Sequence, residues 1–163
     1  MPTHSQRRHV LHPPAEMYEL VADIARYPDF LPWCIGARVR KREAGTEPNT
    51  ELVTADLIIA YKMFREKFTS RVTLDHDRLA IDVAYLEGPF RHLANHWRFL
   101  PREEGGGSCD VDFHIDFEFK SKTLQLMTER VFARATNKLV TAFVDRADQL
   151  NAPASVTAVV EPE

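Results

Sequence analysis

Hydrophobic and polar residues alternate along most of the middle of the chain, and such alternation predicts β-strands. The last alternating segment is the clearest, because its odd positions from Cys109 to Phe119 are apolar and its even positions are polar. One face of this strand is therefore expected to be buried and the other to face water. With turns placed at clusters of Gly, Pro, Asn and Asp, the pattern predicts strands at 3–11, 35–42, 50–61, 64–75, 79–87, 92–100 and 108–119.

Helical spacing occurs at two other places. After Pro13 and Pro14, apolar residues at positions 17, 20, 21 and 24 predict a short amphipathic helix. The segment 27–34 holds two prolines four residues apart, so we expect a stiff apolar connection there. From Ser121 to Leu150 the chain has neither Pro nor Gly, and apolar residues recur every three or four positions. This spacing predicts one long helix, about 43 Å in length and capped at Ser121.

These elements predict an α+β domain over residues 1–150. Short links between successive strands favour an antiparallel arrangement, and a sheet with one apolar face must cover that face. Because only the final helix is long enough, we expect a curved antiparallel sheet of six to seven strands wrapped around it. A curled sheet contacts a single helix along a line, which should leave a cavity between them. Residues 151–163 show no periodicity and are expected to form a disordered tail.

Composition narrows the class of protein. With 163 residues, 44% of them hydrophobic, the chain can bury a core without metals or disulfides. Its two well-separated cysteines and the absence of a secretory leader after Met1 predict a reduced, cytoplasmic protein. A net charge of −3 argues against DNA binding by the whole domain but leaves room for a local basic patch.

Four stretches of the chain together resemble one family. They are Tyr18–Cys34, which ends in the run Tyr-Pro-Asp-Phe-Leu-Pro-Trp-Cys, and then Phe68–Arg71, Gly88–Phe99 and Ala142–Ala147. In this order and spacing they are similar to the coenzyme Q-binding branch of the START-like, polyketide-cyclase-type superfamily, which includes a bacterial ribosome association toxin. The resemblance covers residues 4–150.

The resemblance implies a helix-grip (START-like) fold with a hydrophobic tunnel that holds ubiquinone and supports respiration, without catalysis. For the toxin branch it implies binding to the large ribosomal subunit and a block of subunit joining. The motifs do not separate the two branches, so both functions stay open. The expected ligand is ubiquinone, a related isoprenoid quinone or another lipid, and no catalytic cofactor is expected. Peripheral contact with the inner membrane face is a further expectation.

Large apolar side chains are the expected ligand contacts. Those in loops or at strand ends are expected at the mouth of the pocket. The full set of predicted contacts is Leu31, Trp33, Phe64, Phe68, Ser70, Tyr85, Phe90, Leu93, Trp97, Phe113, Phe117, Met127, Val131 and Phe132. The polar candidates for hydrogen bonds to quinone oxygens are Ser70, Arg71, Tyr85 and Asn95.

A cyclase-like enzyme is the second alternative. The titratable residues of the last strand lie on its wet face, so a catalytic site would need Glu66, Tyr85 or Asn95 to converge in one pocket. His92 and His96 would lie roughly 13 Å apart on a strand, too far to bind one metal ion together. We therefore expect neither catalysis nor a metal site.

Ribosome binding would need basic surface. Four cations stand within five residues, at Arg38, Arg40, Lys41 and Arg42, and form the candidate RNA contact. Given the net charge, an ordinary solvated and ion-paired surface is the competing interpretation. Phosphate contacts would give binding that weakens steeply with salt.

Overall fold

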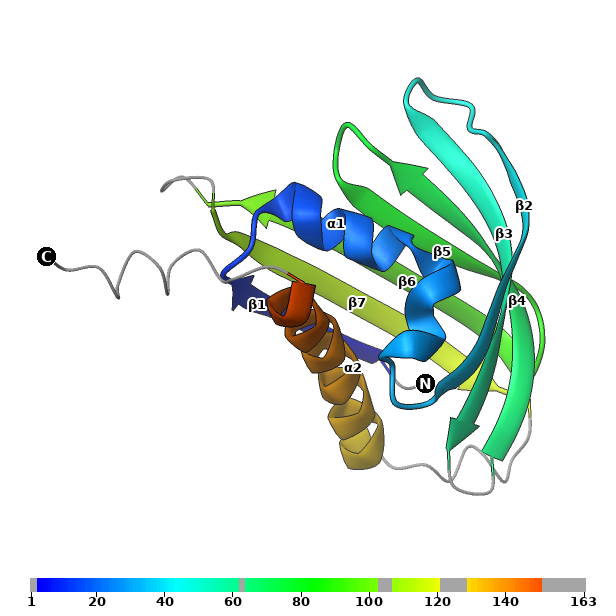
Figure 1. Ribbon diagram of the computed structural model, residues 1–163. Helices are drawn as coiled ribbons and strands as arrows, with labels where there is room; N and C mark the ends of the chain where they lie inside the picture. Colours follow the sequence, from blue (N-terminus) through cyan, green and yellow to red (C-terminus); the bar gives the residue numbers. More distant parts are fainter. Residues whose placement is uncertain (1–2, 62–63, 103–106, 121–128, 151–163) are drawn as a thin grey trace, which may run out of the picture.

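Within residues 3–61, 64–102, 107–120 and 129–150, which the computed structural model describes, seven strands form one curved sheet with helices on its concave side (Figure 1). The strands are β1 (Thr3–Val10), β2 (Cys34–Ala44), β3 (Thr50–Tyr61), β4 (Phe64–Asp75), β5 (Ala80–Glu87), β6 (Phe90–Pro101) and β7 (Cys109–Phe119). The helices are α1 (Pro14–Ala22), the short 3₁₀-helix η1 (Ile24–Asp29) and α2 (Glu129–Leu150).

The sheet has the order β1-β7-β6-β5-β4-β3-β2, so β2 to β7 are antiparallel neighbours in chain order. β1 lies at the opposite edge, beside β7, and α1 and η1 carry the chain from β1 to β2. The predicted α+β fold, with a curved antiparallel sheet and a C-terminal helix, is confirmed. Every predicted strand is present, and β6 begins at Phe90, two residues before its expected start.

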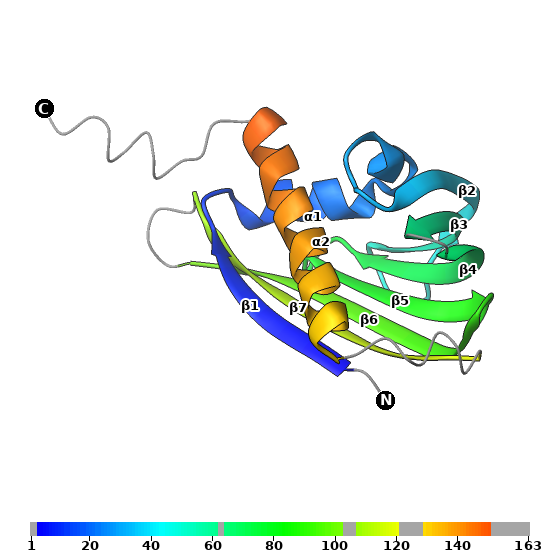
Figure 2. The same cartoon turned by 90° about the horizontal axis from the view of Figure 1, so that it is seen from below.

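Alternate strand positions form an apolar concave face. In β7, for example, Val111, Phe113 and Phe117 are buried, as the alternation predicted. Register shifts in the pairing of β2, β5 and β6 bend the sheet, because a β-bulge bends the strand that carries it. Figure 2 shows the resulting curl, with α2 lying across the part of the concave face that β1 and β7 form.

The stiff connection after α1 contains a 3₁₀ turn that the sequence reasoning did not anticipate. η1 includes Pro28, which lacks an N–H donor and has a fixed φ, so it suits one tight turn but not a longer helix. The turn ends where the backbone N–H groups of Phe30 and Leu31 both donate to the carbonyl oxygen of Tyr27. These three apolar side chains consequently pack against the main core.

α2 is tied to the sheet by hydrogen bonds and by one ring. The Arg8 guanidinium of β1 donates to the side chains of Asn137, over 2.6 Å, and Thr141, over 2.8 Å. Two residues after Thr141, Phe143 packs edge-on against Trp97, with ring centroids 5.3 Å apart. The helix is thereby fixed over β1, β7 and β6, and its other flank faces the rest of the concave surface (Figure 2).

A buried histidine joins the two helices. His12 is only 1% exposed, and its ring nitrogens lie 2.8 Å from a carboxylate oxygen of Glu16 and 2.7 Å from one of Asp148. These contacts connect α1 to the last turns of α2. The predicted beginning of this helix at Ser121 and the predicted tail at 151–163 lie outside the described residues.

The turn between β5 and β6 requires glycine at position 88. Gly88 has a φ of +146°, and a Cβ there would lie 2.5 Å from Cβ of Phe68. This close approach lets the backbone N–H of Phe90 donate to the hydroxyl oxygen of Tyr85 over 3.1 Å. β6 starts two residues before its predicted position because Phe90 already pairs with Phe119 of β7.

We predict that Gly88→Ala lowers the free energy of unfolding by about 1–3 kcal/mol, because it adds both backbone strain and a clash with Phe68. Urea denaturation followed by circular dichroism measures this loss. Gly36→Ala is the matched control, since a Cβ there meets only the flexible end of Ile58 at 3.1 Å. Equal losses for the two variants would contradict the explanation.

Candidate functional site

A cavity of about 280 Å³ lies on the concave side of the sheet, between the strands, η1 and α2. Its wall takes residues from η1, from β2 through β7 and from α2. The wall joins the main core, which contains Trp97 and Phe143, to a smaller aromatic cluster of Phe90, Phe117 and Phe119. The predicted space between sheet and helix is therefore present.

Most of the predicted ligand contacts that can be placed line this cavity. On the wall are Leu31, Trp33, Phe68, Ser70, Phe90, Leu93, Trp97 and Phe117. Met127 lies outside the described residues, as do the side chains of Phe64, Val131 and Phe132. That a ligand touches these residues stays a prediction.

Two predicted contacts, Phe113 and Tyr85, are not part of the wall. Phe113 is 2% exposed and packs edge-on against Trp97 at 4.7 Å, so it fills the core between β6 and β1. Tyr85 packs edge-on against Phe90 at 5.5 Å, and its hydroxyl is already bonded to the Phe90 N–H. Tyr85 therefore packs against the aromatic cluster without forming part of the cavity wall.

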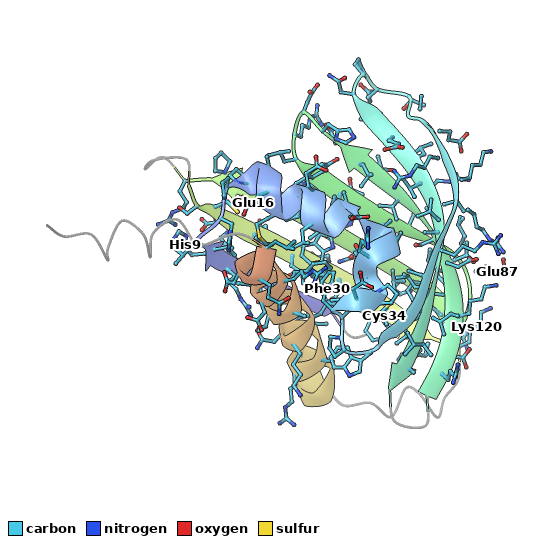
Figure 3. The ribbon with its side chains drawn as sticks, in the orientation of Figure 1. His9, Glu16, Phe30, Cys34, Glu87 and Lys120 are labelled. Carbon is cyan, nitrogen blue, oxygen red and sulfur yellow. The ribbon has the colours of Figure 1, made fainter. Side chains whose placement is uncertain are left out.

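Sequence reasoning missed a second set of wall residues. It includes Ile24, Tyr27, Cys34, Leu57, Ile59, Val83, Leu139 and Phe143. Figure 3 shows one of them, Cys34, together with Phe30 in the region between α2 and β2, whereas Glu87 and Lys120 lie away from this region, at the right of the view. Strand alternation could have identified Leu57 and Ile59, because β3 pairs with β4 in register and Leu57 lies opposite Phe68.

Asn95 is on the wall, but its amide is already bonded to the protein. Its Nδ2 donates to the His114 carbonyl oxygen over 2.9 Å, and its Oδ1 accepts a hydrogen bond from Trp97 Nε1 over 2.9 Å. Thr136 of α2 is also on the wall, and its hydroxyl donates to the carbonyl oxygen of Ala133 over 3.0 Å. Asn95 therefore orients the Trp97 indole instead of offering free groups to a ligand.

Two further polar wall residues, Ser70 and Glu66, are both on β4. Ser70 is 3% exposed, whereas Glu66 is exposed. Arg71, a candidate partner for a quinone oxygen, is exposed and lies opposite Thr54 on the convex face, so it cannot reach the cavity. A ligand inside would thus meet a nearly continuous apolar wall.

Comparison with known proteins shows the family of this fold. Residues 10–144 match the model of the family described as polyketide cyclase / dehydrase and lipid transport. The chain belongs to this family. Solved structures agree: the 18 kDa protein CC1736 from Caulobacter crescentus is 38% identical, with a TM-score of 0.75 over 92% of this chain and 98% of that one. The Zhui aromatase/cyclase from Streptomyces sp. R1128 shares the fold, with a TM-score of 0.71 at 18% identity over 92% and 96% of the two chains.

Curated relatives in this family carry two kinds of name. The ribosome association toxin RatA of Escherichia coli (strain K12) is 33% identical over 150 residues, which are 92% of this chain and 89% of the relative. The mitochondrial coenzyme Q-binding protein COQ10 of Drosophila melanogaster is 29% identical over 142 residues, which are 86% of this chain but 56% of the relative. The family thus includes cyclases, a quinone-binding protein and toxins.

Two titratable groups in the cavity wall are held neutral. The Tyr27 hydroxyl donates to the carbonyl oxygen of Val21, and burial raises its pKa well above the ordinary value. Burial also raises the pKa of the Cys34 thiol, which donates to the carbonyl oxygen of Gly36 over 3.4 Å. A neutral thiol is a poor nucleophile and a neutral phenol a poor base.

The four cations predicted as an RNA contact do not form one free patch. Three of them are paired: Arg40 with Asp56 at 2.8 Å, Lys41 with Glu43 at 3.6 Å, and Arg42 with Glu51 at 3.1 Å. Arg38 is exposed and has no ion pair within the described part of the chain.

Strand alternation puts Lys41 and Arg42 on opposite faces of β2, and a β-bulge at Arg40 puts Arg42 on the opposite face from Arg38 as well. Lys41 lies opposite Thr54 on the convex side, whereas Arg42 lies opposite Val53, a core residue. The basic surface is therefore smaller than four cations within five residues of the sequence suggest.

Histidines on the convex face pair with carboxylates. His92 Nε2 lies 3.4 Å from Asp116 Oδ1, and His96 Nδ1 lies 2.6 Å from Asp82 Oδ1. In the segments that the structure describes, no three His, Cys, Asp or Glu side chains gather as a metal site. None of the helices within those segments is long and apolar enough to cross a membrane.

We predict slow alkylation of both cysteines in the native protein. Burial raises the pKa of Cys34 and brings that of Cys109 to about 12, so the reactive thiolate is scarce at pH 8. Iodoacetamide should modify both at least about tenfold more slowly than in the urea-unfolded chain, as measured by peptide mass spectrometry. Cys34→Ser and Cys109→Ser assign the rates, and a native rate as fast as the unfolded one would refute the burial argument.

Proposed function

We propose that this protein binds an isoprenoid quinone, ubiquinone above all, in the concave cavity, and that it supports respiratory electron transport without turning the ligand over. The apolar wall of the cavity supports the proposal most directly. Its rings and aliphatic side chains, among them Trp97, Phe117 and Leu93, suit a hydrocarbon tail and an aromatic-sized head group. A coenzyme Q-binding relative in the same family supports the choice of ligand class.

The energetics of transfer explain why few polar groups suffice. Burial of apolar surface is worth about 0.8 kcal/mol per CH₂ relative to water, so one five-carbon unit contributes very roughly 3–4 kcal/mol. A lipid carrier, however, takes its ligand from a bilayer, and moving a tail from bilayer to apolar pocket is nearly neutral. Selection among lipids therefore falls to the few polar groups of the wall.

The polar chemistry of the wall supports binding over catalysis. General acid–base catalysis needs a titratable group near the reacting atoms. Glu66 is a carboxylate of the wall, but it is exposed, and the Tyr27 hydroxyl is committed to a backbone carbonyl. Burial keeps Tyr27 and Cys34 protonated at neutral pH, so neither would act as a base towards a cyclase substrate.

We predict that natively purified protein yields a quinone in near-stoichiometric amount when organic extracts are analysed by mass spectrometry. Leu93→Asp should abolish this yield, because it places a carboxylate on the apolar wall. Leu86→Asp is the matched control, since Leu86 is 46% exposed and lies outside the wall. Thermal melts report whether each variant folds.

Leu93→Trp keeps the test decisive if the aspartate variant unfolds, because it fills space without burying a charge and should also lower occupancy. Repeated extraction of wild-type protein without any quinone would contradict the proposal. Equal quinone yield from wild type and both Leu93 variants would place the ligand elsewhere.

A second candidate function is association with the large ribosomal subunit and interference with subunit joining. The identity to proteins named ribosome association toxin, 33% over 92% of this chain for the Escherichia coli relative, favours it. The structure suggests where such contacts would lie. Arg38 and Arg71 are exposed on the convex face, and neither has an ion pair among the residues described.

For this second function we predict sedimentation with large ribosomal subunits in sucrose gradients, with binding that falls steeply between 50 and roughly 200 mM salt. Arg38→Ala combined with Arg71→Ala should reduce it, and the melting temperature should stay unchanged. Arg40 is left intact, since its removal would deprive the buried Asp56 of its nearest cation. Binding that changes neither with salt concentration nor with these substitutions would refute contacts through this face.

A further inference from the structure

Ser70 carries a buried hydroxyl of the cavity wall that has no hydrogen-bond partner in the described part of the chain. It is 97% buried, yet no hydrogen bond from or to its Oγ exists among the described residues. In the same residues, no side-chain nitrogen or oxygen is both sealed from solvent and unbonded. The Ser70 hydroxyl must therefore open on the cavity that it lines.

The surroundings of Ser70 leave room for a ligand group. Its neighbour across the sheet on β3 is Ala55, a small residue that also lines the cavity. On the other side, the pairing with β5 is broken by a β-bulge in which Leu86 is the extra residue, and Ser70 lies opposite Tyr85. Bulges of this kind commonly re-aim side chains beside functional sites.

Each of the other polar groups nearby already has a hydrogen-bond partner in the protein. The amide of Asn95 is bonded to Trp97 and to the backbone of β7, and the Tyr85 hydroxyl accepts the Phe90 N–H. A donor that opens on a nearly apolar cavity and has no protein partner carries part of the penalty of an unmade hydrogen bond. An acceptor supplied by the ligand removes that penalty.

We propose that the Ser70 hydroxyl donates a hydrogen bond to a ring carbonyl oxygen of the bound quinone, and so distinguishes quinones from plain lipid tails. This inference rests on the proposed quinone function and names the residue that selects the head group. Glu66 lies four residues before Ser70 on the same strand and on the same face, roughly 13 Å away, and is exposed. In this arrangement the quinone ring lies inside the cavity at Ser70, and the isoprenoid tail extends along β4 towards the exposed Glu66.

Two probes and two variants test this hydrogen bond. Decylubiquinone carries the ring oxygens and decylbenzene has a ring and tail without them. Wild type should bind decylubiquinone more tightly, and Ser70→Ala should weaken only decylubiquinone binding, by about 3- to 10-fold. Thr73→Ala is the matched control, because Thr73 lies on the same strand but on the convex face, opposite Leu52; it should leave both affinities unchanged.

Infrared spectra distinguish a direct hydrogen bond from Ser70 from a merely structural role of this residue. In wild type, one carbonyl stretching band of bound decylubiquinone should shift to lower frequency, and Ser70→Ala should reverse that shift. Unchanged affinity and an unchanged carbonyl band in Ser70→Ala would overturn the inference while leaving quinone binding intact. Failure of the wild type to bind decylubiquinone would overturn the proposed function, and this inference with it.

Discussion

The concave face of the seven described strands is wider than one helix can cover, and the position of the cavity follows from this mismatch. Arg8 and Trp97 hold α2 over β1, β7 and β6. Over the remaining strands the wall is completed by η1 and the start of β2, and open space remains between them and the sheet. Close packing is what folding energy favours, so unfilled apolar space at this position is better explained by a ligand than by stability.

Polar groups are arranged to keep this space apolar. The Asn95 amide is used to fix the Trp97 indole, and the Tyr27 hydroxyl is bonded to the backbone of α1. The charged side chains of β6 and β7 face the opposite side of the sheet, where His96 and Asp82 pair. Ser70 has no hydrogen-bond partner in the described part of the chain, and under the proposed function it selects the head group.

The sequence predicted the fold well because strand alternation reports which face is buried, and β7 is the clearest example. Alternation could not show which residues of the buried face reach the cavity. Phe113 and Phe117 share a strand and a face, yet only Phe117 reaches the cavity, since Trp97 packs over Phe113. The β-bulge that puts Arg42 on the opposite face from Arg38 also leaves no mark in the sequence, because it depends on how β2 pairs with β3.

Methyl-labelled NMR of the protein titrated with decylubiquinone tests most directly that the cavity is a ligand site. The account predicts intermolecular NOEs from the ligand to the methyl groups of Leu57, Val83 and Leu139, which line the cavity on three different elements. The methyl groups of Leu86, exposed outside the wall, should show none. A titration that leaves the three wall residues unshifted, or that perturbs Leu86 instead, would contradict the account.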